Sequence, residues 1–333
     1  RNADLPPEVG KAAGLWATLA PRMGTYLRWT WIPLLVWLPL ACGGHAPKTV
    51  GTYRSVQGPG GSLLQVPDPL TGLMPANGAV LDFVAEFVGP EGVVAMPLGT
   101  LEYSNLVGDE RARWSRLPIV ADLQLEELIS AKVDFLIGHD WQEPQLKQVL
   151  GRAGLGALYL PTVRSFEDLE QSLTWVGKVL DREPRAQELV QQLRALKAQL
   201  ATQGAPLAER TAMVYSNYGA GGGTSGSGTS YDLMIQLAGL RNAATVAGIE
   251  GHVDLDIEGL LSIQPDFLIL TGAADGSSTS LDSLKQALGA APLTAIEKGW
   301  VVLLPPNQLT TASHHLVYAA QGLQEQALRL LKL

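Results

Sequence analysis

The sequence contains a single cysteine, Cys42, and it has no excess of basic residues. One cysteine excludes a disulfide framework and any cysteine-rich zinc or iron–sulfur site. Lysine and arginine number 24 against 32 aspartates and glutamates; the net charge of −8 argues against the basic surface that nucleic-acid binding requires. Hydrophobic residues nevertheless make up 46% of the 333 residues, which is too many for a disordered chain and enough for about two domains.

The most apolar run, residues 31–41, is too short to cross a bilayer, which needs about 20 residues. Met23 and Arg28 precede it, and a positive start before an apolar stretch is typical of a secretory signal. The small residues around Cys42 resemble the lipobox of bacterial lipoproteins, although Pro39 stands where the lipobox prefers leucine. We therefore expect upstream translation or disorder over residues 1–22, a lipoprotein-type signal over 23–41, and a lipid anchor at Cys42 with a flexible tether over 42–61.

Residues 122–137 and 254–269 carry the same pattern, 132 residues apart and without a gap. Nine of the sixteen aligned positions are identical. Each copy places a short amphipathic helix before a continuous apolar run, which is typical of a strand covered on both faces. Asp122 and Asp254 head the two copies and are natural helix N-caps. The repeat predicts two related lobes.

Apolar runs and helical periods alternate around both copies, which predicts parallel sheets. The predicted fold is α/β, with two related Rossmann-like lobes over residues 62–163 and 205–333. Strands are expected at 93–96, 135–137, 155–160, 211–216, 267–270 and 300–304, and helices at 79–88, 145–152 and 231–238.

Residues 164–204 are expected to link the lobes through helices. Ser165 and Asp168 have the spacing of a capping box, which predicts a helix to about Leu180. Pro184 fits the first position of a second helix, whose apolar residues recur with a helical period as far as Leu200. That helix would be a stiff rod of roughly 25 Å, so the predicted linker is rigid rather than a flexible hinge.

Two α/β lobes joined by a long rigid helix, behind a lipoprotein-like signal, resemble the helical-backbone (class III) substrate-binding proteins of ABC importers for vitamin B12, ferric siderophores and heme. The resemblance covers about residues 62–333 and is carried by three motifs, at 183–189, 228–244 and 258–266. It implies capture of a metal chelate or a corrinoid such as cobalamin between the lobes, and delivery to an ABC permease and its ATPase. The opening of the first lobe departs most from the family, with residues 63–66 the best candidate for the strand before Asn77.

Ligands of open α/β sheets bind beyond the carboxyl ends of the strands, so the loops there should line the cleft. Tyr103, Trp141 and Tyr218 could stack on a flat macrocycle or a catecholate, or could simply pack at a lobe rim. His139 could coordinate the metal of a bound chelate or be an ordinary satisfied histidine. The expected ligand-binding set is Tyr103, Ser104, His139, Trp141, Asn217, Tyr218, Thr271, Asn307 and Gln308.

No resident metal and no cofactor are expected. His314 and His315 are adjacent, but adjacent residues on a helix diverge in direction, so joint coordination is not expected. Besides these two, His139 and His252 are the histidines available to the lobes, which argues against bare zinc as the cargo.

Members of this family dock on the permease through an acidic residue on each lobe. The resemblance implies this role for Glu143 and, as the nearest acid in the second lobe, for Asp232. The expected protein is a monomer outside the cytoplasm, attached to the membrane through Cys42, without nucleic-acid partners and without enzymatic activity.

Two alternatives belong to other functional classes. Gly221, Gly223 and Gly226 fit the spacing G-x-G-x-x-G, so a dinucleotide-dependent enzyme is one of them, although glycines are so frequent here that the match is weak. A surface-anchored ligand sensor or scaffold without a transport role is the other. A serine hydrolase is not indicated, because Ser225 lacks the second glycine of G-x-S-x-G.

Overall fold

The computed structural model describes residues 52–217, 221–273, 276–289 and 291–332. All of them belong to one compact unit, Thr49–Leu333. The expected upstream segment, the signal and Cys42 lie outside the described residues, as does Tyr218. Among the helices described, none combines the length and the apolar character needed to cross a membrane.

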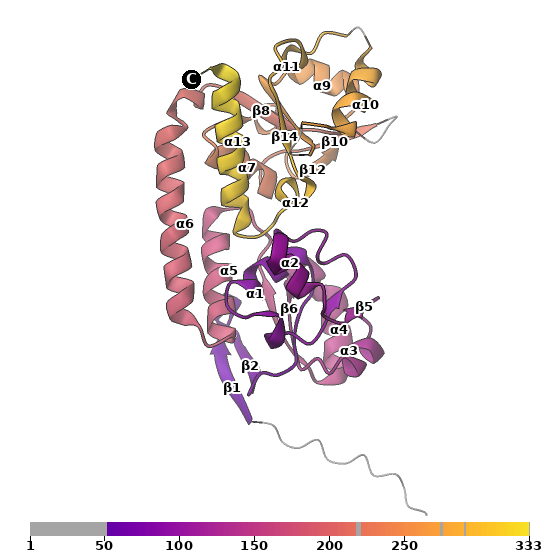
Figure 1. The fold of residues 1–333 in the computed structure, drawn as a ribbon, viewed down its shortest axis with the longest axis vertical. Helices are drawn as coiled ribbons and strands as arrows, with labels where there is room; N and C mark the ends of the chain where they lie inside the picture. Colours follow the sequence, from indigo (N-terminus) through magenta and orange to yellow (C-terminus); the bar gives the residue numbers. More distant parts are fainter. Residues whose placement is uncertain (1–51, 218–220, 274–275, 290, 333) are drawn as a thin grey trace, which may run out of the picture. The chain divides into compact units, whose positions relative to one another are not determined.

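The N-terminal lobe is built on a parallel sheet in the order β3-β6-β7, with a second parallel pair, β4-β5 (Figure 1). The central strand β6 is buried along its whole length, which explains its continuous apolar run. The strands are β3 (Leu73–Pro75), β4 (Met96–Pro97), β5 (Ile119–Val120), β6 (Phe135–His139) and β7 (Gly156–Leu160). The helices are α1 (Gly78–Ala85), α2 (Gly108–Trp114), α3 (Leu125–Ser130) and α4 (Glu143–Ala153).

An antiparallel hairpin precedes this lobe and corrects two expectations. It consists of β1 (Thr52–Gln57) and β2 (Leu63–Asp68), joined by a 3-10 turn at Pro59–Gly61. The expected tether over 42–61 is therefore wrong from residue 52 onward: the glycines there supply the positive φ angles of a tight turn. Residues 63–66 are likewise hairpin, and the strand before Asn77 is β3.

The C-terminal lobe has a parallel sheet in the order β11-β8-β13-β14 and a small antiparallel sheet in the order β12-β10-β9, which was not expected. The strands are β8 (Thr211–Val214), β9 (Ser216–Asn217), β10 (Gly222–Ser225), β11 (Arg241–Asn242), β12 (His252–Asp254), β13 (Phe267–Thr271) and β14 (Val301–Leu304). The helices are α7 (Ser230–Leu237), α8 (Ala243–Val246), α9 (Ile257–Ile263), α10 (Thr279–Leu288), α11 (Thr294–Glu297) and α12 (Pro306–Leu309).

The 132-residue repeat is confirmed in the structure, because α3 and β6 correspond to α9 and β13. Asp134 and Asp266 precede these two strands, and each accepts hydrogen bonds from a threonine. The Asp134 carboxylate accepts from the backbone N–H and hydroxyl of Thr71 at 3.4 and 3.3 Å, and that of Asp266 accepts from Thr211 at 2.9 and 3.1 Å. Each repeated aspartate therefore ties its strand to the neighbouring segment.

Two details of the predicted elements are wrong. Asp122 and Asp254 are not the caps: α3 and α9 begin two residues later, at caps Gln124 and Asp256, and Asp254 instead pairs in β12. The strand expected at 93–96 starts only at Met96, because a 3-10 turn at Pro90–Gly92 comes just before it. The other expected strands and helices are confirmed, with ends shifted by up to three residues.

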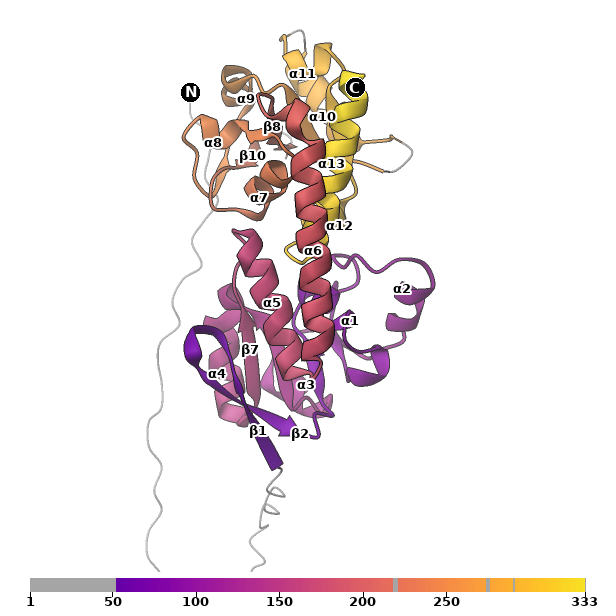
Figure 2. The same cartoon turned by 90° about the vertical axis from the view of Figure 1, so that its left-hand side faces the viewer.

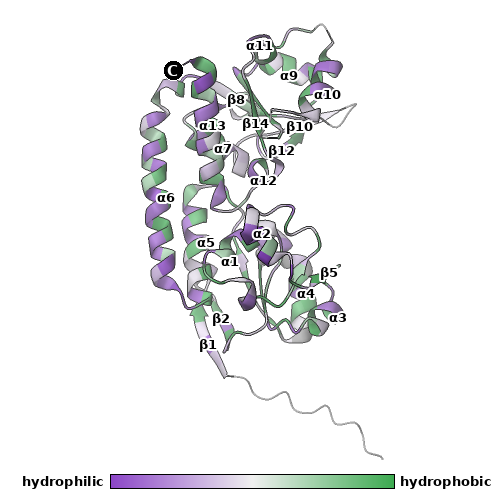
Figure 3. Ribbon diagram, viewed as in Figure 1, coloured by the Kyte–Doolittle hydropathy of each residue, from purple (hydrophilic) through white to green (hydrophobic). Residues whose placement is uncertain are grey.

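Three long helices run beside the two lobes: α5 (Phe166–Val179), α6 (Glu183–Gln203) and α13 (His315–Leu331) (Figure 2). The capping box of Ser165 and Asp168 is present, and Pro184 lies in the first turn of α6. At 21 residues α6 is about 31 Å long, and its apolar positions form one stripe against a polar face (Figure 3). One continuous core joins residues of β6, α6, β13 and α13, so the helices bind both lobes into one body.

Candidate functional site

A pocket of about 320 Å³ has lining residues from both lobes. It lies at the carboxyl ends of β3 and β6, where ligands of parallel sheets are expected to bind. The C-terminal lobe contributes Thr310 and Ala312, from the segment between α12 and α13. The N-terminal lobe contributes Ala76, Asn77, Gly78, Ala79, Pro97, Leu98, Gly99, Thr100, Tyr103, His139 and Trp141.

Asn77 fixes the orientation of the His139 ring in this pocket. Its side-chain Oδ1 caps α1 by accepting from the Val80 N–H at 3.0 Å, so its Nδ2 must face the other way. That Nδ2 donates to Gln142 Oε1 at 2.7 Å and lies 3.1 Å from His139 Nδ1. Because Nδ2 is a donor, Nδ1 of a neutral His139 is the acceptor and the ring proton resides on Nε2.

Burial keeps His139 neutral. The side chain is 1% exposed as the last residue of β6, and desolvation lowers its pKa to about 4, with Asp140 and the backbone of Ala312 opposing the shift only in part. Nε2 is buried and makes no hydrogen bond of normal geometry with any described residue. His139 therefore presents an N–H donor that faces the backbone of Ala312 without a hydrogen bond of normal geometry, and not a free lone pair, which weakens its expected role as a metal ligand.

Exposed aromatic side chains stand at the rim of the pocket. Trp141 is 63% exposed and stacks on the His139 ring, with centroids 6.1 Å apart and planes inclined by 12°. Tyr103 is 59% exposed. The hydroxyl of Thr100 is buried in the lining without a partner among the described residues. Apolar faces with a few unpaired polar groups are the features of a small-molecule site.

The structure thus brings Tyr103, His139 and Trp141 together, and leaves Ser104, Thr271 and Gln308 elsewhere. Ser104 is buried, and its hydroxyl donates to the Leu101 carbonyl. Thr271 lines a separate pocket of about 440 Å³ within the C-terminal lobe. Gln308 is exposed on α12, and none of the pockets described in this section has it in its lining.

Three further expected residues lie close to the cleft or outside the described part of the chain. Asn307 Nδ2 donates to Asn105 Oδ1 across the lobes at 3.2 Å, so it joins the lobes rather than lining the pocket. Asn217 ends β9, but its side chain lies outside the described part, as does Tyr218. Sequence reasoning missed Asn77, although an asparagine followed by glycine between a strand and a helix is a recognisable cap signal.

Of the two acids expected to dock on the permease, the structure describes the side chain of Asp232 but not that of Glu143. Glu143 begins α4, and its side chain lies outside the described part. Asp232 is wrong as an exposed docking acid, because it is 6% exposed. Its carboxylate accepts from Gln236, Asn242 and Thr245 at 2.7 to 3.0 Å, so it holds α7 to β11 and α8 instead.

The glycine-rich segment does not form a phosphate loop. Residues 222–225 are strand β10, paired antiparallel with β9 and β12, rather than the strand–loop–helix cradle that binds dinucleotides. A Cβ at Gly226 would lie 1.9 Å from the carbonyl oxygen of Ile249. Gly226 therefore allows a close backbone approach, and the arrangement does not support the dinucleotide alternative. A pocket of about 420 Å³ beside β10 is lined by Ser225, Tyr231 and His252 among others.

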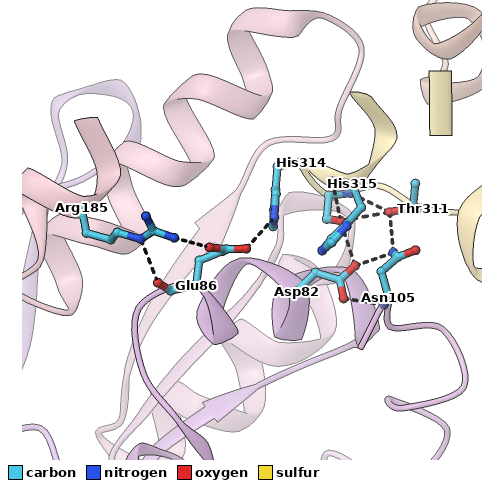
Figure 4. Close-up of polar contacts among 8 residues, drawn as sticks. Asp82, Glu86, Asn105, Arg185, Thr311, His314 and His315 are labelled. Atoms are coloured by element: carbon cyan, nitrogen blue, oxygen red, sulfur yellow. Dashed lines mark hydrogen bonds and ion pairs between the residues drawn. The ribbon is translucent and has the colours of Figure 1, made fainter. Parts of the chain in front are cut away.

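A polar cluster joins the two lobes next to the pocket (Figure 4). Asp82 of α1 is 1% exposed and accepts from Asn105 N and Nδ2 at 2.7 Å and from Ser313 Oγ at 2.8 Å. Asn105 also donates to Thr311 Oγ1 at 3.2 Å. Burial raises the pKa of Asp82 against these hydrogen bonds. No local sequence signal marks this cluster, because its hydrogen bonds across the lobes join residues more than 200 positions apart.

The second half of the cluster involves Glu86, at the end of α1. Its Oε1 accepts from His314 Nε2 at 3.3 Å and its Oε2 from Arg185 Nη2 of α6 at 2.9 Å. The hydrogen bond from His314, followed by the charges of His314 and Arg185, lowers the Glu86 pKa to about 2 despite burial. Burial lowers the pKa of His315 to about 3. The rings of His314 and His315 lie only 4.4 Å apart, so the expected divergence is wrong: His314 caps α13, outside its first turn.

Comparisons with known proteins agree with this architecture. The family model described as periplasmic binding protein matches residues 121–308. A protein of an ABC-type Fe3+-hydroxamate transport system from Saccharomonospora viridis is 20% identical, with a TM-score of 0.66 over 82% of this chain and 98% of that chain. No curated protein sequence matches the chain significantly.

Two heme-binding proteins have the same fold. A periplasmic heme-binding protein from Pseudomonas aeruginosa is 23% identical, with a TM-score of 0.64 over 78% of this chain and 92% of that chain. The periplasmic heme-binding protein from Roseiflexus is 21% identical, with a TM-score of 0.63 over 77% and 98%. At these identities the likeness establishes the two-lobed, helix-linked fold.

Proposed function

This chain belongs to the periplasmic binding protein family, and we propose that it captures a metal chelate, heme or a ferric siderophore, in the pocket between its lobes. It then delivers the chelate to the permease of an ABC importer and acts outside the cytoplasm. Cobalamin is a further cargo of the same kind. No bond is made or broken, so the pocket needs shape and a few polar anchors rather than catalytic groups.

One observation carries the choice of cargo class: the buried Nε2–H of His139, which makes no hydrogen bond of normal geometry, beside the exposed rings of Trp141 and Tyr103. A planar or aromatic chelate gives these rings a face to stack on. Anionic or carbonyl oxygens, such as heme propionates or hydroxamates, give the buried N–H an acceptor, and hydrogen bonds to charged groups are the stronger ones. The Tyr103 phenol could reach a ferric centre as an oxygen ligand.

Attachment and docking complete the proposal. Cys42 would carry the lipid that holds the protein at the membrane, and Glu143 would meet the permease from the N-terminal lobe. The C-terminal docking residue must be an exposed acid other than Asp232. A surface sensor without a permease would use the same pocket, and it differs from a transport protein only in its partners.

The test begins with the full chain purified from its host. Recovery in the membrane fraction supports the lipid anchor, and an absorption band of heme, a ferric chelate or cobalamin identifies the cargo. The cargo-free protein is then titrated with hemin and with a ferric hydroxamate. We expect His139→Phe to weaken binding by about 10- to 100-fold, since a hydrogen bond to a charged group contributes about 1.5–3 kcal/mol.

His139→Gln keeps an N–H donor and should restore part of the affinity, and His252→Gln, at an exposed position of the C-terminal lobe, is the matched control. Equal affinity of the His139→Phe variant and the wild type would contradict the proposed role of the pocket. Binding of neither chelate would exclude the cargo class.

A further inference from the structure

Three metal-binding side chains converge where the lobes meet. Glu86 comes from the end of α1 in the N-terminal lobe, and His314 and His315 come from the start of α13. One possible ligand atom from each of them lies within 4.8 Å of the other two. The group stands apart from the proposed cargo pocket, whose lining includes none of the three.

The separation of the ligand atoms fits a coordinated ion. Two ligands bound tetrahedrally at 2.0–2.2 Å from a zinc ion lie roughly 3.3 to 3.6 Å apart. Glu86 Oε1 and His314 Nε2 are 3.3 Å apart, which is long for a charge-assisted hydrogen bond. A ligand atom of the half-buried His315 lies within 4.8 Å of the other two, so a small rotation of its ring would bring it to coordination distance.

His314 is poorly satisfied by the protein itself. Its side chain is 2% exposed, yet Nδ1 has no partner among the described residues and Nε2 has only the long contact with Glu86. A buried polar group with so few partners costs free energy and calls for an explanation. Its ring packs at 5.4 Å from Phe83 and 4.4 Å from His315, which holds it beside Glu86.

The surroundings hold the carboxylate and balance the charge. Arg185 binds Glu86 Oε2 and leaves Oε1 directed at His314, the arrangement by which outer partners orient a ligating carboxylate. Asp82, one helical turn before Glu86, adds a buried carboxyl group beside the half-buried carboxylate of Glu86. The partial positive charge at the N-terminus of α13 disfavours a cation there. Its free-energy cost is much smaller than the free energy gained from coordination by three ligands.

We propose that Glu86, His314 and His315 form a binding site for a borderline divalent cation, best suited to zinc, that joins the two lobes. Two imidazoles and one carboxylate are a ligand set of zinc, with water as the fourth ligand. Hard cations such as Mg²⁺ and Ca²⁺ prefer oxygen ligands alone, so they should bind weakly. Its three ligands are not part of the lining of the cargo pocket, and bound zinc would link α1 directly to α13.

The test uses the purified full chain, stripped with a chelator and free of cargo. Calorimetric titration with Zn²⁺ should show one ion per chain, and Co²⁺ should give the visible absorption of a four-coordinate site. His315→Gln and Glu86→Gln should each weaken zinc binding by at least about 10-fold. His139→Gln and His252→Gln are the matched controls and should bind zinc like the wild type.

Thermal unfolding of the metal-free variants checks that they fold. Both substitutions should be tolerated, because His315 is half-buried and Glu86→Gln keeps a side chain that can accept from Arg185. Zinc at 100-fold excess over its Kd should raise the Tm of the wild type by about 5 °C or more and leave that of His315→Gln unchanged. Absence of zinc binding, or binding that both variants retain, would overturn the proposal. A His139→Phe protein that loses hemin but keeps zinc would separate this site from the cargo pocket.

Discussion

Asn77 shows how a single side chain sets the chemistry of the pocket. Its oxygen is committed to the start of α1, so its nitrogen must face His139 and fix the proton on Nε2. A histidine that sequence reasoning regards as a possible metal ligand thereby becomes a hydrogen-bond donor. The choice between the two roles depends on a neighbour 62 residues away.

The buried His139 should make the ligand-free protein sensitive to mild acid. Its pKa is about 4 in the fold against about 6.5 in the unfolded chain, so its contribution is complete above pH 6.5 and is lost as pH falls toward 4. Between these values the unfolded state binds more protons, and the free energy of unfolding falls by up to about 1.4 kcal/mol per pH unit. Urea unfolding of the wild type and His139→Gln at several pH values measures this, and parallel profiles would refute it.

The repeated helix–strand elements show that the sequence predicts where an element lies better than the residue at which it begins. Asp134 and Asp266 recur because each holds a threonine next to the neighbouring strand. Asp122 and Asp254 recur as well, but the helices begin two residues later. In the second copy, pairing in β12 outweighs the intrinsic preference of aspartate for a cap, so tertiary pairing decides where the helix starts.

The two repeated aspartates should differ in their importance. Asp266 accepts from Thr211 at 2.9 and 3.1 Å and pairs with Arg210. Asp134 makes longer contacts, and its Oδ1 is buried without a partner among the described residues. We expect Asp266→Ala to lower the free energy of unfolding by about 1–3 kcal/mol, and Asp134→Ala by less. Urea denaturation compares them, and a larger loss for Asp134→Ala would reverse the argument.

At the scale of the whole molecule, the lobes share one hydrophobic core through α6 and α13. A large hinge motion would expose this core, since its residues from both lobes pack on the same helices. The interlobe bonds of Asp82, Asn105 and Asn307 add polar contacts that opening would break. Cargo binding should therefore move the lobes little.

Small-angle scattering with and without bound chelate measures this motion. The radius of gyration of a compact body the size of the unit Thr49–Leu333 is about 19 Å, and we expect cargo to change it by less than about 1 Å. The cargo-free His139→Phe variant, treated with the same chelate, controls for effects of the chelate alone. Compaction by several ångströms would show that the shared core does not hold the lobes.

The sequence predicted the lobes, the linking helices and the placement of Tyr103, His139 and Trp141, because periodicity, caps and strand ends are local signals. It did not predict that Asp232 is buried, since its partners Asn242 and Thr245 are brought to it by the turn after α7. Nor could it predict Glu86 beside His314, because that pair forms only when the two lobes fold onto α6. Contacts between distant segments carry the information that local patterns lack.

The segment from Thr310 to His315 contributes residues both to the cargo pocket and to the Glu86 cluster. Thr310 and Ala312 line the pocket, Thr311 and Ser313 bind the N-terminal lobe, and His314 and His315 face Glu86. Any occupant of the pocket that shifts this short segment must also change the affinity of the Glu86 cluster for its own ligand. By thermodynamic linkage, a ligand of the Glu86 cluster must then change the affinity of the pocket for its cargo by the same factor.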